Sequence, residues 1–215
     1  MDKPILFQDD LVRMILSGRK TQTRRIVKIK GDLPHEDGTI TQDRPEINQF
    51  TYWPPLPKPS IHDVNDGSKE PDINLTHFAC PFGVPGDRLW VREVWAHDPF
   101  SDRIIYRSSW LNTTGIRWKS SIHMKKQYCR IWLEVTRIRI QRVQEISNDD
   151  AWCEGVSDSP EYNCIAYFKD VWERINGEKA GCSWEDNPYV WAIDFKQVDP
   201  GRKNFPGTQY ARIVG

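Results

Sequence analysis

The segment 129–146 constrains the fold most, because its apolar residues change face partway along an expected strand. Ile131, Leu133 and Val135 occupy odd positions, Ile138 and Ile140 occupy even positions, and the parity changes again at Val143. The slip falls at Thr136 and Arg137, and an extra residue at such a point is a β-bulge, which bends the strand. Bent strands of this kind build small β-barrels, so the segment favours a curved sheet.

Shorter elements surround this strand. We expect strands at 3–7, 22–29, 88–95, 103–107 and 189–195, and helices at 8–17, 147–154 and 161–175. This order fits neither a doubly wound parallel sheet nor a sandwich. It predicts an α+β fold, a small and partly open β-barrel decorated by helices, as one domain over residues 1–199. Residues 200–215 are expected to form a loosely ordered tail.

A long segment interrupts the pattern from about residue 30 to residue 76. It is rich in Pro, Asp, Asn and Gly, and proline removes backbone donors and fixes φ. We therefore expect an irregular insertion without helix or sheet, acting as a lid or packing as an ordered loop. The aromatic residues Phe50, Tyr52 and Trp53 indicate that part of it packs against the domain.

Composition limits the partners and the cellular location that we expect. Lys plus Arg and Asp plus Glu balance at 30 each, so no global field attracts nucleic acid or membranes, and a polyanion would need a local patch. No apolar run is long enough for a membrane span, and the N-terminus lacks a signal-peptide pattern, so we expect a cytoplasmic protein. The five cysteines are interpreted as reduced thiols. His77 and Cys80 have no matching second pair, so neither a metal site nor a cofactor is expected.

The segment 17–25 is the strongest candidate for function. Gly18 occupies the position of a helix C-cap, and a strand follows at Ile26. A corner of this composition can hold an anion or a nucleotide, or supply an amine and a hydroxyl for chemistry; the alternative is a solvated basic turn. Its cations are Arg19, Lys20, Arg24 and Arg25, and its hydroxyls are those of Thr21 and Thr23.

Four further motifs accompany this corner. They are Pro85-Gly86-Asp87-Arg88-Leu89-Trp90-Val91-Arg92-Glu93, Ser120-Ser121-Ile122-His123-Met124, Ala151-Trp152-Cys153-Glu154-Gly155 and Trp184-Glu185-Asp186-Asn187-Pro188-Tyr189-Val190-Trp191. Together the five resemble the ASCH-domain family, in its longer type often encoded by phages and prophages, over roughly residues 4–197. The resemblance implies a PUA-like β-barrel whose cleft near the corner accommodates RNA or a modified nucleoside. For a phage-encoded protein the expected location is the host cytoplasm.

The resemblance also implies candidate catalytic residues. Small bacterial members are amidohydrolases that remove the acetyl group of N4-acetylcytidine, and their Lys, Thr and Glu correspond to Lys20, Thr23 and Glu154. Other members are ribonucleases. The chain departs from its relatives after Met124, where Lys125-Lys126-Gln127 replaces the usual Pro-Arg, and in the insertion at 30–76. Both departures bear on the substrate more than on the fold.

The chemistry of these residues is consistent with amide hydrolysis without a metal. Thr23 offers a nucleophile, and Lys20, with its pKa lowered by burial or by neighbouring cations, can accept the proton. Glu154 can position water or protonate the departing amine, and Arg24 can face the oxyanion. The alternative for Glu154 is a surface carboxylate paired with an arginine.

A second set of candidates contacts the substrate in this hypothesis. Arg92 and Glu93 interrupt an apolar strand beside Trp90, whose ring can stack a base, and His123 can contact the substrate. The alternatives are solvent-facing or paired charges and a rim histidine. The substrate-binding candidates are Arg19, Thr21, Arg24, Arg25, Trp90, Arg92, Glu93 and His123. Three functions stay open, namely RNA or nucleotide binding, amide hydrolysis and ribonuclease activity, and the motifs leave the oligomeric state open.

Overall fold

The computed structural model describes residues 2–30, 32–35, 37–44, 49–53, 76–101, 103–110, 114–155 and 163–199. The expected tail at 200–215 and the proline-rich centre of the insertion lie outside the described residues.

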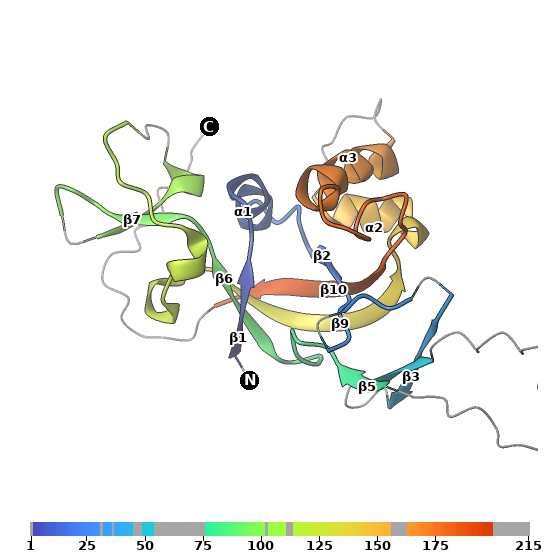
Figure 1. The fold of residues 1–215 in the computed structure, drawn as a ribbon. Coiled ribbons are helices and arrows are strands. Elements are labelled where there is room, and N and C mark those ends of the chain that lie inside the picture. The colour runs from blue at the N-terminus through green and yellow to red at the C-terminus, as the bar shows by residue number, and fades with distance from the viewer. Residues whose placement is uncertain are drawn as a thin grey trace, which may run out of the picture.

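A five-stranded sheet forms the centre of the fold, in the order β1-β6-β9-β10-β2 (Figure 1). Its strands are β1 (Asp2–Leu6), β2 (Gln22–Ile26), β6 (Arg88–Arg92), β9 (Trp132–Arg142) and β10 (Tyr189–Val198). The β1 and β6 strands run parallel, and the other neighbours are antiparallel. The expected pairing of the segments around residues 88, 130 and 190 is therefore confirmed.

The predicted bulge lies in the long β9–β10 ladder. Asp194 is opposite Arg137, whereas the next residue, Phe195, is opposite Val135, so Thr136 is left without a partner. The slip lets Val135 and Ile138, at positions of opposite parity, both be buried in the same core. The strand bends there, and the sheet curves.

The curved sheet is open. Its edge strands are β1 and β2, and no strand pairing among the described residues joins them. Helix α1 (Asp9–Leu16) runs from one edge to the other, and the Arg25 Nη2 of β2 donates a hydrogen bond to the Leu6 carbonyl oxygen at 2.5 Å. The Arg25 guanidinium also lies 5.0 Å from the ring centre of Phe7. The fold is thus α+β. In a closed barrel β1 and β2 would be hydrogen-bonded to each other, whereas here the Arg25 side chain makes the contact between the two edges.

The insertion is more regular than the sequence indicated. Strands β3 (Thr39–Arg44) and β4 (Gln49–Trp53) form an antiparallel sheet with β5 (Thr76–Ala79), so the expectation of no sheet was wrong for these two stretches. Both are rich in β-branched and aromatic residues, which suit a pleated surface, whereas the prolines gather after Trp53. Phe50 joins the main core through an edge contact with Trp191, with ring centres 5.0 Å apart.

Two helices cover the end of the sheet near β2 and β10. Helix α2 (Asn148–Cys153) begins after Ser147, whose Oγ accepts a hydrogen bond from the Asp150 backbone N–H, and α3 (Cys164–Asn176) begins after Asn163. Phe168 and Trp172 of α3 form a second core with Val190 of β10.

The described residues between 95 and 130 form a small lobe, which lies on the opposite side of α1 from helices α2 and α3 (Figure 1). A hairpin of β7 (Trp95–His97) and β8 (Ile104–Tyr106) is followed by three 3-10 turns, η3 (Arg107–Ser109), η4 (Ser121–His123) and η5 (Lys126–Tyr128). Trp95, Met124, Cys129 and Trp132 form its core. The expected strand 88–95 is thus two strands, since β6 ends before β7 begins. A further turn, η6 (Val143–Glu145), joins β9 to α2.

Candidate functional site

The corner after α1 returns the chain into the core. Gly18 adopts a φ of +75°, and the Lys20 backbone N–H donates to the Met14 carbonyl oxygen at 3.1 Å. The Thr21 N–H then donates to the Cys153 carbonyl oxygen at 2.9 Å. These contacts hold the corner against the end of α2 and leave only 2% of Lys20 exposed.

Lys20 and Glu154 form a buried ion pair. The Lys20 Nζ lies 2.6 Å from Glu154 Oε2 and also donates to the Glu154 carbonyl oxygen at 2.9 Å. Glu154 follows the last residue of α2 and is 8% exposed. The next residue, Gly155, has a φ of +94°, and a Cβ on it would lie 2.8 Å from Met14 Sδ and 3.2 Å from the Lys20 Cβ. Glycine at this position therefore permits the close approach of the two segments.

Arg24 is the second cation on Glu154. Its Nη1 donates to Glu154 Oε1 at 3.1 Å, and its Nη2 donates to Asp150 Oδ2 at 2.9 Å. Glu154 therefore bridges Lys20 and Arg24, with one oxygen for each.

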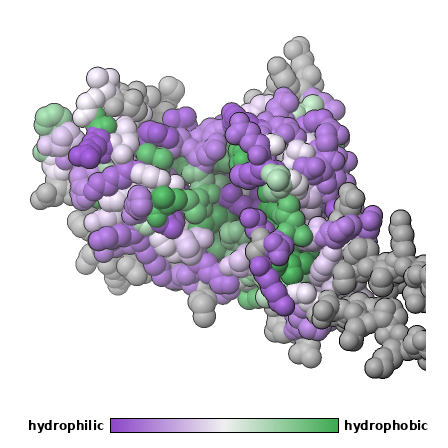
Figure 2. Space-filling model, viewed as in Figure 1, coloured by the Kyte–Doolittle hydropathy of each residue, from purple (hydrophilic) through white to green (hydrophobic). Residues whose placement is uncertain are grey.

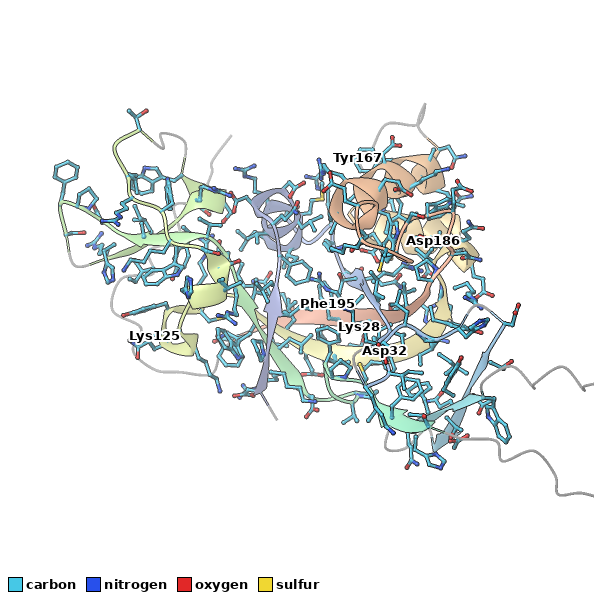
Figure 3. All side chains as sticks on the ribbon, in the orientation of Figure 1. Lys28, Asp32, Lys125, Tyr167, Asp186 and Phe195 are labelled. Atoms are coloured by element: carbon cyan, nitrogen blue, oxygen red, sulfur yellow. The ribbon has the colours of Figure 1, made fainter. Side chains whose placement is uncertain are left out.

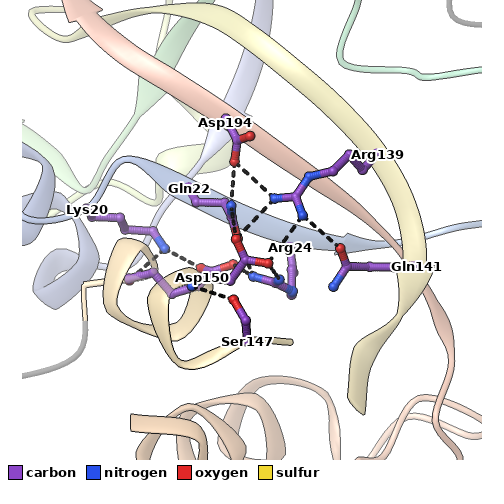
Figure 4. Close-up of polar contacts among 9 residues, drawn as sticks. Lys20, Gln22, Arg24, Arg139, Gln141, Ser147, Asp150 and Asp194 are labelled. Carbon is purple, nitrogen blue, oxygen red and sulfur yellow. Dashed lines mark hydrogen bonds and ion pairs between the residues drawn. The ribbon is translucent and has the colours of Figure 1, made fainter. Parts of the chain in front are cut away.

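The ion pair belongs to a larger polar network (Figure 4). Arg139 of β9 donates to both oxygens of Asp150, at 3.2 and 3.3 Å, and to Asp194 at 3.4 Å. Gln22 donates to Asp150 at 2.9 Å and to Asp194, and accepts from Arg24. Cations and carboxylates are equal in number in this network, whose charged members are Lys20, Arg24, Arg139, Asp150, Glu154 and Asp194.

Burial sets the electrostatics of the corner. Desolvation lowers the pKa of Lys20, although Glu154 acts in the opposite direction. Burial raises the pKa of Asp150, but hydrogen bonds from Arg139 and Gln22 outweigh it and hold the value at about 2. Desolvation also lowers the pKa of Arg25. The charges of Lys20 and Arg24 are matched by carboxylates, so these two cations are not the solvated basic turn that the sequence left as an alternative.

A cavity of about 320 Å³ opens between α1, β2 and α3. In Figure 2, hydrophobic side chains gather at the centre of the face, between the lobe and α3, with hydrophilic ones around them. The polar residues lining the cavity include Lys20, Thr23, Arg24, Arg25 and Glu154. Its apolar residues include Leu11 and Met14 of α1, Phe82, and Phe168, Val171 and Trp172 of α3. Tyr167, labelled in Figure 3, lines it from α3 as well.

The structure thus brings part of the predicted site together. Lys20, Thr23 and Glu154 line one cavity, together with Arg24 and Arg25. The other two corner candidates do not line it. Arg19 is exposed and donates its Nε to Ser17 Oγ at 3.2 Å, and Thr21 is exposed.

The second set of candidates lies away from this cavity. Arg92 donates its Nε to the Ser121 carbonyl oxygen at 3.0 Å and lies 5.5 Å from the ring centre of Trp90. Glu93 is fully buried and accepts two hydrogen bonds from Arg130, each 2.9 Å long. His123 is exposed on the lobe.

The sequence did not predict several residues of the cavity and of the polar network. Asp150 precedes Glu154 by four residues, a spacing that places both carboxylates on one helical face, so this signal was present. Arg139 and Asp194 meet only through the register of β9 against β10, which the sequence does not reveal. Phe168 and Trp172 of α3 also line the cavity, and no sequence pattern indicated this.

Neither a protein-family model nor a curated protein matches the chain. Two solved structures are similar to it. An ASCH domain from Lactobacillus crispatus JV V101 has 12% identity and a TM-score of 0.38, covering 91% of this chain and 79% of that one. A protein from Enterococcus faecalis V583, described by the family model DUF984, has 11% identity and a TM-score of 0.39, covering 93% and 81%. The first belongs to the family that the motifs resemble. At TM-scores below 0.5, nothing about ligand or activity follows from either similarity.

Among the described residues, no helix is both long enough and apolar enough to cross a membrane.

Proposed function

We propose that the cavity between α1, β2 and α3 binds the base of a nucleoside, a nucleotide or an RNA. One observation carries this proposal: buried donors and an acceptor gather at one part of a cavity whose other lining residues are mainly apolar and aromatic, with Asp10, Asn176 and Lys179 as further polar residues. Flat heterocycles are held in this way, with stacking or packing on their faces and hydrogen bonds on their edges. The volume of about 320 Å³ is near the small end of ligand cavities and suits one base rather than several.

The polar residues favour a base with an amino group beside a carbonyl. Each oxygen of Glu154 accepts one N–H from Lys20 or Arg24, and a carboxylate has about four lone-pair positions, so it can accept further donors. A cytosine-type amino group suits such an acceptor. Arg25, which forms no ion pair among the described residues, supplies a donor and a positive charge. In an RNA the base would enter the cavity unstacked.

Calorimetric titration tests this proposal with cytidine, uridine and adenosine. We expect cytidine to bind most tightly and Glu154→Gln to weaken it at least about tenfold, the cost of one lost charge-assisted hydrogen bond. Glu134→Gln, at an exposed ion pair with Lys196, is the matched control and should bind as the unchanged protein does. Phe168→Leu provides a second variant that keeps all the charges and removes an aromatic wall. Unchanged cytidine affinity in both cavity variants, with their fold verified by circular dichroism, would exclude this cavity.

A second candidate function, hydrolysis of an amide on a modified base, is supported by the state of Lys20. Its Nζ makes two hydrogen bonds to Glu154, and burial lowers its pKa. In the fraction of molecules in which Lys20 has released its proton, the amine keeps two N–H donors on Glu154 while its lone pair accepts a proton. Thr23, which lines the same cavity, supplies a hydroxyl.

In this candidate mechanism Lys20 takes the Thr23 hydroxyl proton while Thr23 Oγ1 attacks the acyl carbon. The carbon–nitrogen bond then breaks, and the base amine leaves with the proton from Lys20. Water cleaves the resulting Thr23 ester, releases the acid and restores the hydroxyl. Arg25, which lines the same cavity, faces the oxyanion that forms in each step.

Release of cytidine from N4-acetylcytidine, followed by chromatography, tests the hydrolase. Thr23→Val should abolish release and keep binding, because it removes the nucleophile and little volume. Thr21→Val, two residues away and outside the cavity lining, should retain full turnover. Turnover that survives Thr23→Val would rule out this mechanism. The ribonuclease alternative gains no support from these contacts, since the guanidinium of Arg24 is already engaged by Glu154 and Asp150.

A further inference from the structure

The charge of the chain is balanced overall but not along the lobe. Between Arg103 and Arg130 the sequence contains seven lysines and arginines and no aspartate or glutamate, although the whole chain has 30 of each kind. The cations are Arg103, Arg107, Arg117, Lys119, Lys125, Lys126 and Arg130. A local patch of this kind is what a protein with zero net charge needs in order to bind a polyanion.

Folding neutralises only part of this charge. Arg107 pairs with Asp9, Lys126 lies 2.8 Å from Asp2, and Arg130 lies 2.9 Å from Glu93. Each of these carboxylates belongs to an element outside the segment. The three pairs hold the lobe against α1, β1 and the end of β6, so they are structural contacts.

Four cations of the lobe have no such role; one of them, Arg103, acts on the pKa of nearby Asp98, and the other three are exposed. Arg117, Lys119 and Lys125 form no ion pair within the described part of the chain. Lys119 lies 4.7 Å from the ring centre of Trp95, and Lys125 is on the lobe surface in Figure 3. These charges stay available for a partner.

Exposed aromatic residues accompany the free cations. Phe100, at the tip of the hairpin between β7 and β8, is 95% exposed, and Trp110 is 40% exposed. Exposed rings and exposed positive charges on one lobe are the combination that holds unpaired bases and their phosphates, because every base has a face that can stack.

The lobe and the cavity lie on two sides of one helix. Ser108 of the lobe accepts a hydrogen bond from Arg13 Nε of α1 through its carbonyl oxygen at 2.8 Å, whereas Leu11 and Met14 of the same helix line the cavity. A helix with its side chains is about 10–12 Å across, so a chain held on the lobe can cross α1 and place a base in the cavity.

We infer that the lobe binds the phosphodiester backbone of single-stranded RNA through Arg117, Lys119 and Lys125, with Phe100 and Trp110 as stacking surfaces. This surface is separate from the cavity of the proposed function. An anionic membrane is the other polyanion to consider, but interfacial binding relies on an amphipathic helix, and the only helical segments in the described part of the lobe are three-residue 3-10 turns.

Fluorescence anisotropy with a labelled single-stranded RNA of about 16 nucleotides tests this inference. The triple variant Arg117→Gln, Lys119→Gln, Lys125→Gln should bind at least tenfold more weakly than the unchanged protein at about 50 mM salt. Its slope of log affinity against log salt should be smaller by about 2, since each phosphate contact on a single strand contributes about 0.7. The matched control is Lys28→Gln, Lys30→Gln, Arg137→Gln, which removes the same charge from exposed sites outside the lobe and should keep the RNA affinity.

Equal losses in the two triple variants would overturn the inference, because net charge alone would then explain binding. Binding of the unchanged protein to phosphatidylserine vesicles but not to RNA would overturn it too. The cavity is tested independently. The lobe variant should keep its cytidine affinity, and Glu154→Gln should keep the salt slope of RNA binding, so failure of one proposal is distinguishable from failure of the other.

Discussion

Lys20 and Glu154, 134 residues apart in the chain, lie 2.6 Å apart across the start of β2 and the end of α2, with their side chains 1% and 7% exposed. Arg24 holds the other oxygen of Glu154 at 3.1 Å. One carboxylate thus compensates two buried cations. Loss of that carboxylate leaves Lys20 with no counter-charge, and an uncompensated buried charge is costly.

Glu154→Gln should therefore lower the free energy of unfolding by about 3–5 kcal/mol, measured by urea denaturation at pH 7. The Lys196–Glu134 pair has a similar distance of 2.8 Å, but its side chains are 59% and 34% exposed, so Glu134→Gln should cost less than about 1 kcal/mol. The double variant Lys20→Met, Glu154→Gln should be more stable than the sum of the two single losses predicts. Additive losses would mean that the two side chains act independently.

The sequence predicted those features of the fold that depend on local periodicity. The parity change around Thr136 predicted the bulge, and the helices expected at 147–154 and 161–175 correspond to α2 (Asn148–Cys153) and α3 (Cys164–Asn176). The strands β3 and β4 were not predicted because the proline content was taken to exclude strands from the whole insertion. Most of these prolines lie after β4.

In the candidate site, too, residues of a local motif were predicted and residues that depend on strand register were not. The motif of Lys20 and Thr23 with Glu154 predicted three side chains of one cavity. The arginine and carboxylate network behind them depends on the register of β9 against β10, which sets Arg139 beside Asp194, and no local pattern encodes that register. Glu93 was assigned to the site because it is isolated in an apolar strand, but a partly buried arginine 37 residues later explains the same pattern.

Asp150 should make the protein sensitive to acid. Its pKa is about 2 in the fold against an ordinary 3.8, so its stabilising contribution is complete above pH 3.8 and is lost as the pH falls through about 2. The contribution is about 1–2 kcal/mol after allowance for partial exposure. Between pH 6 and pH 2 the free energy of unfolding should fall by about 1–2 kcal/mol less for Asp150→Asn than for the unchanged protein, as measured by denaturation curves. Asp149→Asn removes the same charge from the exposed face of α2 and should follow the unchanged protein; identical curves for all three proteins would contradict the prediction.

Gly155→Ala should destabilise the protein through both conformation and contact. Its φ of +94° is strained for alanine, and the new Cβ would lie 2.8 Å from Met14 Sδ. Gly18→Ala is the natural control, because its φ is +75° with nothing within 4 Å of the added atom. We expect a loss of about 1–2 kcal/mol for Gly18→Ala and a larger loss for Gly155→Ala, by thermal or urea unfolding. Equal losses would show that Met14 moves aside without cost.

Comparison of Glu93 with Glu154 distinguishes a carboxylate that stabilises the fold from one that binds the ligand. It is fully buried, receives two hydrogen bonds from Arg130 at 2.9 Å and one from Ser108, and lies outside the cavity lining. Glu93→Gln should thus lower the free energy of unfolding by about 2–4 kcal/mol, because Arg130 loses its counter-charge.

The cytidine affinity of the folded Glu93→Gln protein should stay unchanged, whereas Glu154→Gln weakens it at least about tenfold. Calorimetric titration of both variants, at a temperature where circular dichroism shows each to be folded, makes the comparison. Equal losses of affinity in the two variants would return Glu93 to the substrate-binding set that the sequence predicted. A loss confined to Glu154→Gln would assign Glu93 to the attachment of the lobe, where it ties β6 to η3 and to the start of β9.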